Sequence, residues 1–258
     1  MLLTINVGNT NVVFGVFDGE DLTGSWRAET DVHRMPDEYA MFLRSALETR
    51  GLHFSDLTGS IIASVVPPLT PAMQELCLRY LGRAALVVGS GIKTGVRVRI
   101  DNPAEVGADR VVNALAAHTL YGGPCIVIDL GTGTTFDAVS RQGDYLGGAI
   151  APGIGVAAEA MFLRTAKLPR IELAPPPNVI GKNTVHAMQS GVVLGYVGLV
   201  EGLVARLRAE MGPQTKVIAT GGLAPIIARL TNVFDAMDQD LTLKGLRMIY
   251  QLNQHGEL

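Results

Sequence analysis

The residues best suited to chemistry lie in a glycine- and threonine-rich stretch near the middle of the chain. An apolar run, Cys125–Ile128, ends on Asp129, and Gly131, Thr132 and Gly133 follow. Short apolar runs bounded by turn residues are typical of buried strands. The amides and hydroxyls of such a turn can hold phosphate oxygens, and a carboxylate at the strand end can hold a cation. A plain hairpin with a Gly-Thr turn would have the same sequence, so this stretch alone leaves both interpretations open.

A similar pattern stands near the N-terminus. The segment from Ile5 to Gly15 again runs from an apolar strand through a polar residue and a glycine into a second strand. A shift of 123 positions places Ile5 on Ile128, Asn6 on Asp129, Gly8 on Gly131 and Phe14 on Asp137. We interpret the two copies as phosphate-binding hairpins of two related half-domains that face one nucleotide.

Candidates for the reacting groups lie between these copies. Asp109 and Arg110 follow Gly107 and Ala108, in a helix that we expect to start at Asp101-Asn102-Pro103 and to run to about residue 121. A charge pair on a helix is usually solvated, but small neighbours let another molecule approach. Asp109 could accept or orient an alcohol proton, and Arg110 could clamp an acidic group. Asp137 is a further candidate, with Asp129, for ordering cations.

The remaining pattern alternates strands and helices. We expect strands at 84–88 and 96–100, and a long helix at 185–211 that Asn183 and Thr184 begin. Its glycines at 191, 195, 198 and 202 predict a close packing face, such as a dimer interface. Gly221 and Gly222 turn a strand into a helix, where their amides could approach an adenine or ribose; a plain strand–helix turn fits equally well. The predicted fold is α/β, with two similar halves, 1–115 and 116–258, and a cleft between them.

Composition excludes several classes of function. A net charge of −3 offers no basic face for nucleic acid. Cys77 and Cys125 lie in apolar contexts, which predicts reduced core residues, and the five histidines are isolated, His255 among them. We find no signal peptide, no membrane span and no P-loop sequence, and we expect a cytoplasmic protein.

Five short motifs occur together and in one order. They are Val7-Gly8-Asn9-Thr10; Asp101-Asn102-Pro103 with Gly107-Ala108-Asp109-Arg110; Asp129 to Thr135; Gly147-Gly148 with Pro152-Gly153; and Gly181-Lys182-Asn183-Thr184. In this combination the chain resembles the type III pantothenate kinases of the acetate/sugar kinase–Hsp70–actin superfamily over nearly its whole length. The resemblance implies a duplicated ribonuclease-H-like (actin-like ATPase) fold and a homodimer. It also implies ATP-dependent phosphorylation of pantothenate to 4′-phosphopantothenate, the first step of coenzyme A biosynthesis.

The resemblance also implies roles for individual residues. Asp109 corresponds to the proton acceptor, and Asp129 corresponds to the ligand of a monovalent cation, K⁺ or NH₄⁺, with Mg²⁺ accompanying ATP. Pantothenate is expected at Ile100, Gly107, Ala108, Asp109, Arg110 and Thr184, the last contributed by the partner subunit. ATP is expected at Asn6, Val7, Gly8, Asn9, Thr10, Asn11, Val12, Val13, Gly131 and Thr132, with Gly221 and Gly222 as further nucleotide contacts.

Two positions depart from the family pattern. Asn6 stands where an aspartate is usual, and Ile100 stands where a tyrosine usually lines the pantothenate pocket. Two hypotheses follow: an active pantothenate kinase, or a weak or inactive relative that binds a ligand and has a regulatory role. A generic sugar or acetate kinase of the same superfamily is a distant third.

Overall fold

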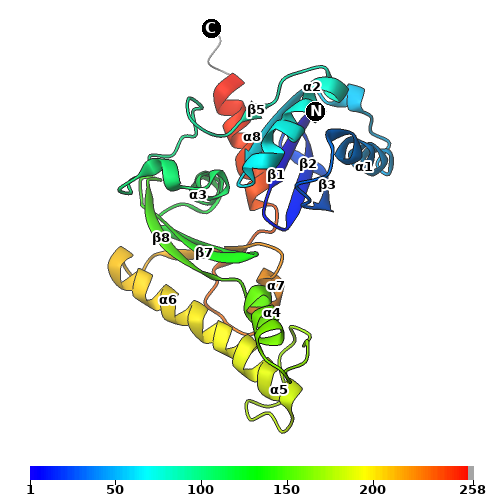
Figure 1. Cartoon of the computed structure of the whole chain (residues 1–258). Helices are drawn as coiled ribbons and strands as arrows, with labels where there is room; N and C mark the ends of the chain where they lie inside the picture. The colour runs from blue at the N-terminus through cyan, green and yellow to red at the C-terminus, as the bar shows by residue number, and fades with distance from the viewer. Residues whose placement is uncertain (255–258) are drawn as a thin grey trace. The chain divides into compact units, whose positions relative to one another are not determined.

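The computed structural model describes residues 1–254, so His255 lies outside the described chain (Figure 1). Two compact units make up the molecule. Within the described chain, unit 1 comprises residues 1–96, 102–116 and 240–254, and unit 2 comprises 97–101 and 117–239. The predicted halves 1–115 and 116–258 stay a prediction, but the contacts group the C-terminal helix with unit 1.

Unit 1 is built on a five-stranded sheet with the order β3-β2-β1-β4-β5. β1, β2 and β3 are antiparallel, whereas β4 and β5 run parallel to β1. The three antiparallel strands follow one another directly along the chain because a tight turn can join antiparallel strands, whereas a parallel strand needs a longer crossover connection. The strands are β1 (Leu2–Val7), β2 (Asn11–Asp18), β3 (Asp21–Glu29), β4 (Gly59–Ser64) and β5 (Leu86–Val87).

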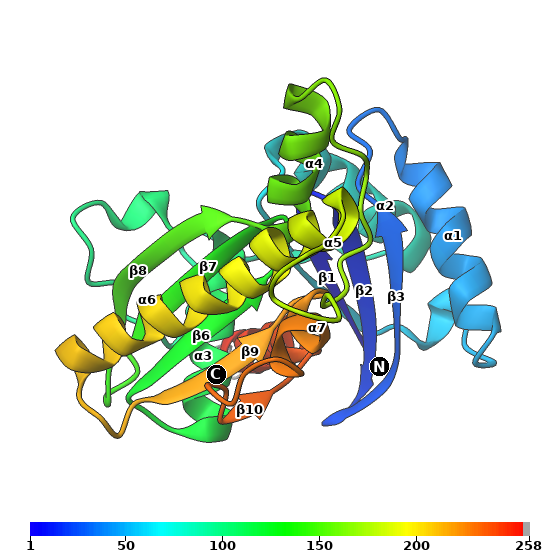
Figure 2. The same cartoon turned by 90° about the horizontal axis from the view of Figure 1, so that it is seen from below.

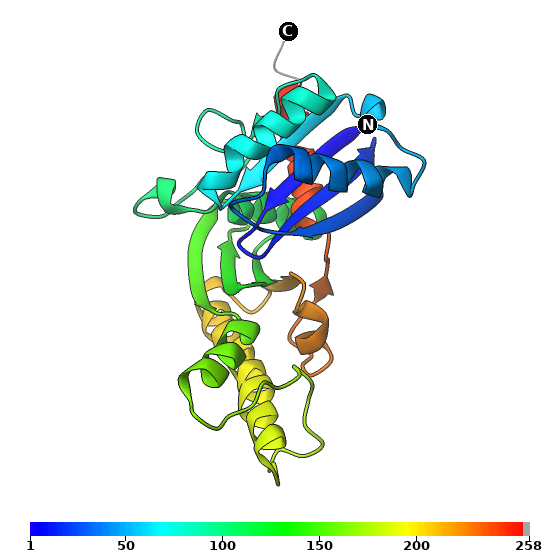
Figure 3. The same cartoon turned by 45° about the vertical axis from the view of Figure 1, so that its right-hand side comes forward.

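Helices cover both faces of this sheet. Alternate residues of β4 point to opposite faces: Ile62 packs under α1 (Pro36–Glu48) and α2 (Thr70–Leu81), whereas Ile61 packs under α8 (Leu241–Gln254). Figure 3 shows α1 and α2 lying together along one side of β1–β3. The start of α3 (Ala108–Tyr121) joins α8 through Val112. Three short 3₁₀ helices complete the helical segments of this unit: η1 (Phe54–Asp56), η2 (Pro67–Leu69) and η3 (Pro103–Glu105).

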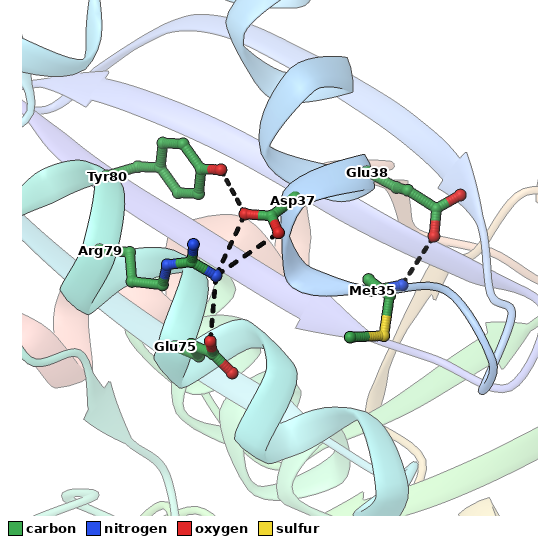
Figure 4. Close-up of polar contacts among 6 residues, drawn as sticks. All are labelled: Met35, Asp37, Glu38, Glu75, Arg79 and Tyr80. Atoms are coloured by element: carbon green, nitrogen blue, oxygen red, sulfur yellow. Dashed lines mark hydrogen bonds and ion pairs between the residues drawn. The ribbon is translucent and has the colours of Figure 1, made fainter.

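Polar contacts tie α1 to α2 on their exposed side (Figure 4). Arg79 Nη1 lies 3.2 Å from Asp37 Oδ1 and 3.2 Å from Glu75 Oε1, and the Tyr80 hydroxyl donates to Asp37. At the start of α1, the Met35 amide donates to Glu38 at 2.8 Å, so the carboxylate caps the helix. Because water screens these half-exposed ion pairs, they add little to stability and serve as a polar contact between the two helices.

Unit 2 has a second five-stranded sheet with the order β10-β9-β6-β7-β8. Read from the opposite edge, as β8-β7-β6-β9-β10, this order matches that of unit 1, with β6 in the place of β1. α6 (Gly195–Met211) lies across its sheet (Figure 2), where Tyr196, Val200 and Val204 pack on the apolar residues of β6. The shared order confirms the predicted duplicated α/β fold. The strands are β6 (Cys125–Leu130), β7 (Gly133–Val139), β8 (Tyr145–Pro152), β9 (Lys216–Thr220) and β10 (Ala236–Met237). The other helices are α4 (Ile154–Arg164), α5 (Thr184–Gln189), the π segment η4 (Ser190–Leu194) and α7 (Ala224–Ala228).

Several predicted elements differ from the structure. The helix predicted from Asp101 begins only at Ala108, because Asn102 caps the separate turn η3 instead: its side chain accepts from the Ala104 amide at 3.3 Å. No strand forms at 96–100, where only Val98 makes an isolated bridge, and the strand predicted at 84–88 is confined to β5. The helix predicted at 185–211 exists with Asn183 as its cap, but it contains the π segment η4.

The alignment of the two hairpins also needs a correction. Val7 pairs with Val12 across residues 8–11, whereas Leu130 pairs with Thr134 across residues 131–133. The second turn is therefore one residue shorter. The constant shift holds through the first strand only, and Phe14 corresponds to Phe136, which faces Ile128 as Phe14 faces Ile5.

One helical stretch of the described chain, Thr184–Met211, is long and apolar enough to cross a membrane by length and composition, with a mean hydropathy of 1.5. A single stretch of this kind is weak evidence, because helices of soluble cores pass the same test. Its residues Val193, Tyr196 and Val200 are buried in the core of unit 2. The expected absence of a membrane span stays a prediction.

Candidate active site

In unit 1 the predicted site residues gather at the carboxyl ends of the parallel strands β1 and β4. The amide of Val65, just after β4, donates to the carbonyl of Val7 at 3.0 Å. In the turn after β1, the Gly8 amide donates to Asn11 at 3.0 Å, and Thr30 Oγ1 donates to the Gly8 carbonyl at 2.7 Å. Ligands of α/β proteins bind beyond such strand ends. Because the side chains of Val7 and Val12 are fully buried, these two residues offer a ligand only their backbone.

Asp109 lies at the same edge of unit 1. A Cβ placed on Gly107 would lie 2.7 Å from Asp109 Oδ1 and 3.3 Å from Val65 Cγ1, so the carboxylate packs directly against the backbone beside the end of β4. The Arg110 amide donates to Asp109 Oδ1 at 2.8 Å in the first turn of α3. Val65 therefore connects the two regions: its amide bonds to Val7 beside the Gly8 turn, and its side chain lies next to Gly107 together with the Asp109 carboxylate.

The environment of Asp109 raises the pKa of its carboxyl above the ordinary value. Burial is the largest cause, and the Arg110 amide and guanidinium act in the opposite direction without cancelling it. A carboxylate with a raised pKa is a stronger base, which suits a group that accepts a proton near neutral pH.

In unit 2 the turns after β6, β8 and β9 converge on Asp129. The Gly153 amide donates to the Thr132 carbonyl at 3.0 Å, and the Leu223 amide donates to the Leu130 carbonyl at 3.1 Å. Gly221 has a φ of +91°, and a Cβ on it would lie 2.4 Å from Asp129 Oδ1. Position 221 thus favours glycine, because a side chain there would strain the backbone and displace the carboxylate.

Other glycines of these turns have no such internal reason. A Cβ on Gly131 would meet nothing closer than 3.6 Å, one on Gly133 nothing closer than 3.8 Å, and one on Gly222 nothing within 4 Å. None of the three has a positive φ. The packing of the described chain therefore leaves room for a Cβ at Gly131 and Gly133 and open space at Gly222. Such space lets a ligand approach the amides, as a phosphate-binding turn requires.

The donor atoms of this edge fit a cation of low charge. Asp129 supplies one carboxylate, and the carbonyls of Gly131 and Thr132 lie together beside Gly153. Within residues 1–254, no cluster of three or more histidine, cysteine or acidic side chains could hold a metal ion alone. A monovalent cation can use backbone carbonyls with one carboxylate, and Mg²⁺ commonly depends on the phosphates of its nucleotide.

Asp137, which the sequence analysis grouped with Asp129 for ordering cations, lies in the interior of unit 2, and that role stays a prediction. Its side chain is fully buried, and it accepts hydrogen bonds from Thr135 Oγ1 and from the Tyr145 hydroxyl, both at 2.9 Å. It supports the β7–β8 pair from inside. This burial could not be predicted from the sequence, because an aspartate after a turn has the same local pattern whether its side chain points inward or outward.

The structure also adds a residue that the sequence analysis missed. The Tyr196 hydroxyl of α6 donates to the Pro152 carbonyl at 2.9 Å and accepts from the Thr134 hydroxyl at 2.5 Å. It thereby links the start of β7, just after the β6 turn, to the end of β8. Tyr196 stands among the glycines of an apolar helix, where no local pattern distinguishes it from a core residue.

Thr184 and Ile100 lie elsewhere in unit 2. Thr184 lines a pocket of about 960 Å³ between α4 and the α5–α6 helix, with Met161, Asn183 and Gly195 among its other walls. Ile100 contacts Gly147 of β8, since a Cβ on that glycine would lie 3.4 Å from Ile100 Cγ2. The predicted residues thus fall into separate groups: Asn6–Val13 and Gly107–Arg110 in unit 1, and Ile100, Asp129–Thr132, Thr184 and Gly221–Gly222 in unit 2.

Two mixed five-stranded sheets with helices, each with a glycine-containing turn at the end of a central strand, match the fold of actin-like ATPase and sugar kinase structures. Solved structures of this class share the fold. One is the activator of the 2-hydroxyisocaproyl-CoA dehydratase from Clostridium difficile with bound ADPNP, at 12% identity and a TM-score of 0.57 over 100% of this chain and 98% of that one. Another is the inorganic polyphosphate/ATP-glucomannokinase from Arthrobacter sp. strain KM, at 16% identity and a TM-score of 0.51 over 98% of both chains.

Sequence comparison defines the family within this class. The family model of type III pantothenate kinase matches residues 2–206. The type III pantothenate kinase of Moorella thermoacetica is 53% identical over 98% of this chain and 100% of its own, and that of Geobacillus kaustophilus is 52% identical over 98% of each. The chain belongs to the type III pantothenate kinase family, whose reaction is the first step of coenzyme A biosynthesis.

Proposed function

We propose that this chain is an active kinase that transfers the terminal phosphoryl group of ATP to the primary hydroxyl of pantothenate. The observation that carries the proposal is Asp109. Its carboxylate is desolvated, has a raised pKa and lies at the strand edge that also bears the Gly8 turn. Few surface aspartates combine these properties, and a proton acceptor requires all of them.

The proposed roles of the other residues follow from their positions. The backbone of Asn6–Val13 and the open turn at Gly131 and Thr132 hold phosphate oxygens, and Gly221–Gly222 lie against the nucleoside. Asp109 orients and deprotonates the hydroxyl, since a loose phosphoryl-transfer transition state needs little deprotonation before attack. Arg110 binds the carboxylate of pantothenate, which a guanidinium matches in geometry.

We assign the cations from the donor atoms. Asp129, with nearby carbonyls, binds K⁺ or NH₄⁺, and Mg²⁺ enters with ATP and is partly coordinated by its phosphates. When bound, these ions neutralise the charge that develops on the transferred group. The side chain of Asn6 offers an amide oxygen in place of a carboxylate, which favours a contact through water over direct coordination.

We also propose that the chain works as a homodimer in the cytoplasm, with Thr184 completing the pantothenate site of the partner. Support comes from apolar side chains that unit 2 leaves exposed near Thr184: Leu163 is 64% exposed, Val179 72% and Ile180 83%. A Cβ on Gly191, Gly195 or Gly198 would meet nothing within 4 Å, so this helix face is open to close packing. Exposed apolar surface of this kind commonly marks a protein interface. Ile180→Glu should shift the mass measured by light scattering to that of a monomer, whereas Glu172→Gln should not.

The decisive experiment is ATP-dependent phosphorylation of pantothenate by the purified protein with Mg²⁺ and K⁺. Product should be 4′-phosphopantothenate, detected by mass spectrometry, and glucose offered in place of pantothenate should remain unchanged. Asp109→Asn serves as the matched control, because it keeps the shape of the side chain and removes the base. Folded protein that binds ATP but leaves pantothenate unmodified would favour the ligand-binding, regulatory alternative.

A further inference from the structure

A single peptide unit connects α6 to the turn after β6. This is the peptide between Pro152 and Gly153, where β8 ends and α4 is about to begin. Its carbonyl accepts the hydrogen bond from the Tyr196 hydroxyl at 2.9 Å, and its amide donates to the Thr132 carbonyl at 3.0 Å. Both polar groups of the peptide are therefore used, one toward the helix and the other toward the turn.

The turn packs closely on this peptide. A Cβ placed on Gly153 would overlap the carbonyl oxygens of both Gly131 and Thr132. These two oxygens are among the donor atoms assigned to the monovalent cation, so a rotation of the peptide would disturb them directly. Because hydrogen bonds in series polarise one another, the bond from Tyr196 also strengthens the bond to Thr132.

The Tyr196 side chain is held so that its hydroxyl reaches the peptide. The ring is buried in the core of unit 2, in the same cluster as Val193 and Val200, and the Thr134 hydroxyl donates to its oxygen at 2.5 Å. Burial raises the pKa of Tyr196 above its ordinary value, and the bond from Thr134 lowers the pKa without cancelling that effect. The hydroxyl therefore keeps the proton that it donates to Pro152.

The helix is irregular just before Tyr196. The π segment η4 ends at Leu194, and Tyr196 is the second residue of α6. One extra residue in a helical turn rotates the residues that follow by about 100° relative to a continuous α-helix, and such π turns are frequent at functional sites. The π segment therefore contributes to the direction in which the Tyr196 side chain leaves the helix.

We propose that Tyr196 is a positioning residue of the candidate active site: through the 152–153 peptide, its hydroxyl holds the Thr132 carbonyl where a monovalent cation binds. The proposal rests on the function proposed above, in which Asp129 and nearby carbonyls bind K⁺. Tyr196 itself contacts neither substrate nor cation. Loss of its hydroxyl leaves the Pro152 carbonyl without this partner and lets the peptide reorient. Cation binding should weaken, whereas the chemical step at saturating K⁺ should be preserved.

Tyr196→Phe tests this role because it removes the hydroxyl and keeps the ring. The K⁺ concentration for half-maximal phosphorylation of pantothenate should rise about threefold to tenfold, at the low end of the cost of losing a group that orients a metal ligand, while kcat at saturating K⁺ stays within about twofold. Tyr121→Phe is the matched control. It removes another hydroxyl hydrogen bond within unit 2, to Asp238 at 3.0 Å, and should keep the K⁺ response of the parent.

A thermal series measures cation binding without turnover. Tm is followed as KCl rises, with ATP and Mg²⁺ present, pantothenate absent and choline chloride keeping the ionic strength constant, because a cation that binds the folded protein raises Tm. Tyr196→Phe should need more KCl than the parent for the same rise in Tm. Thr134→Val removes only the bond that the Tyr196 hydroxyl accepts, so it should shift the K⁺ response less than Tyr196→Phe does.

The outcomes separate this proposal from the proposed function. An unchanged K⁺ response of Tyr196→Phe in both assays would overturn the role of Tyr196, and so would a larger shift in Thr134→Val or a parent whose Tm does not respond to KCl. A parent that responds to KCl but leaves pantothenate unmodified would overturn the proposed function instead. The thermal series would still decide the role of Tyr196 in that case.

Discussion

The two hairpins share one plan but differ at the strand end that faces a ligand. Asn6 pairs with Ala63 of the parallel neighbour, and Asp129 pairs with Thr220. The next residue of that neighbour is Ser64 in unit 1 and Gly221 in unit 2. The Ser64 hydroxyl accepts from the Val66 amide at 3.2 Å, whereas Gly221 leaves its side-chain space to the Asp129 carboxylate.

This difference indicates that each strand-end residue is matched to its neighbour. The Asp129 carboxylate at the end of β6 needs the space that glycine leaves at 221. The Asn6 amide at the end of β1 has Ser64 at the equivalent position, and the Ser64 hydroxyl bonds to the Val66 amide of its own loop. Unit 2 thus supplies the charged group of the hairpin pair. Unit 1 supplies its carboxylate from another element, through Asp109 on α3.

The largest expected effect comes from Asp109, the carboxylate of unit 1. Asp109→Asn should lower kcat for pantothenate by about 10²–10⁴-fold, the usual contribution of a general base. The Kd for ATP, measured by titration, should change little. A variant that turns over as fast as the parent would show that Asp109 neither accepts nor orients the proton.

The raised pKa of Asp109 gives this prediction a second readout. Because folding disfavours the ionised form, the aspartate destabilises the folded protein at pH values above its ordinary pKa, and the effect disappears as the pH falls below that value. Asp109→Asn should therefore raise Tm at pH 7 and not at pH 3.5. The acid limb of kcat/KM in the parent should lie above the ordinary aspartate pKa of about 3.9. A lower Tm for the variant at neutral pH would contradict the desolvated carboxylate.

Asp129 should follow in size. Asp129→Asn makes the second hairpin resemble the first, and it should reduce kcat by about 10²–10³-fold, as the loss of one preorganised electrostatic group does. Titration with KCl distinguishes this role from a structural one, because activity should also lose its dependence on K⁺. Retained K⁺ activation in the variant would place the cation elsewhere.

Gly221→Ser transfers the unit 1 arrangement to unit 2 and should have a smaller effect. The new Cβ would overlap Asp129 Oδ1 and the Leu130 backbone, so the carboxylate must move. We expect the K⁺ concentration for half-activation to rise about tenfold, as for lost positioning groups at metal sites. The reverse exchange, Ser64→Gly, is the matched control and should leave the K⁺ dependence unchanged. An unaltered K⁺ response in Gly221→Ser would break the proposed match between positions 129 and 221.

The sequence predicted the hairpins, the duplicated fold and the family motifs because each depends on local patterns of glycine, apolar and polar residues. It failed where the outcome depends on contacts between distant segments. The burial of Asp137 and its hydrogen bond from the Tyr145 hydroxyl depend on the packing of β7 against β8. The match of Gly221 with Asp129 depends on the register of two strands.

The smallest expected effect concerns Asn6, the residue that makes the first hairpin unlike the second. Asn6→Asp keeps the shape of the side chain and adds a negative charge near the expected Mg²⁺ site, so the Mg²⁺ concentration for half-activation should fall about threefold while kcat stays within about threefold. Initial rates at saturating ATP across a Mg²⁺ series measure both quantities. This outcome would mean that the Asp129 carboxylate alone is enough for catalysis, so that the end of β1 can carry either an amide or a carboxylate. Activity in Asn6→Asp alone would instead mean that both hairpins need a carboxylate and that this chain lacks one of them.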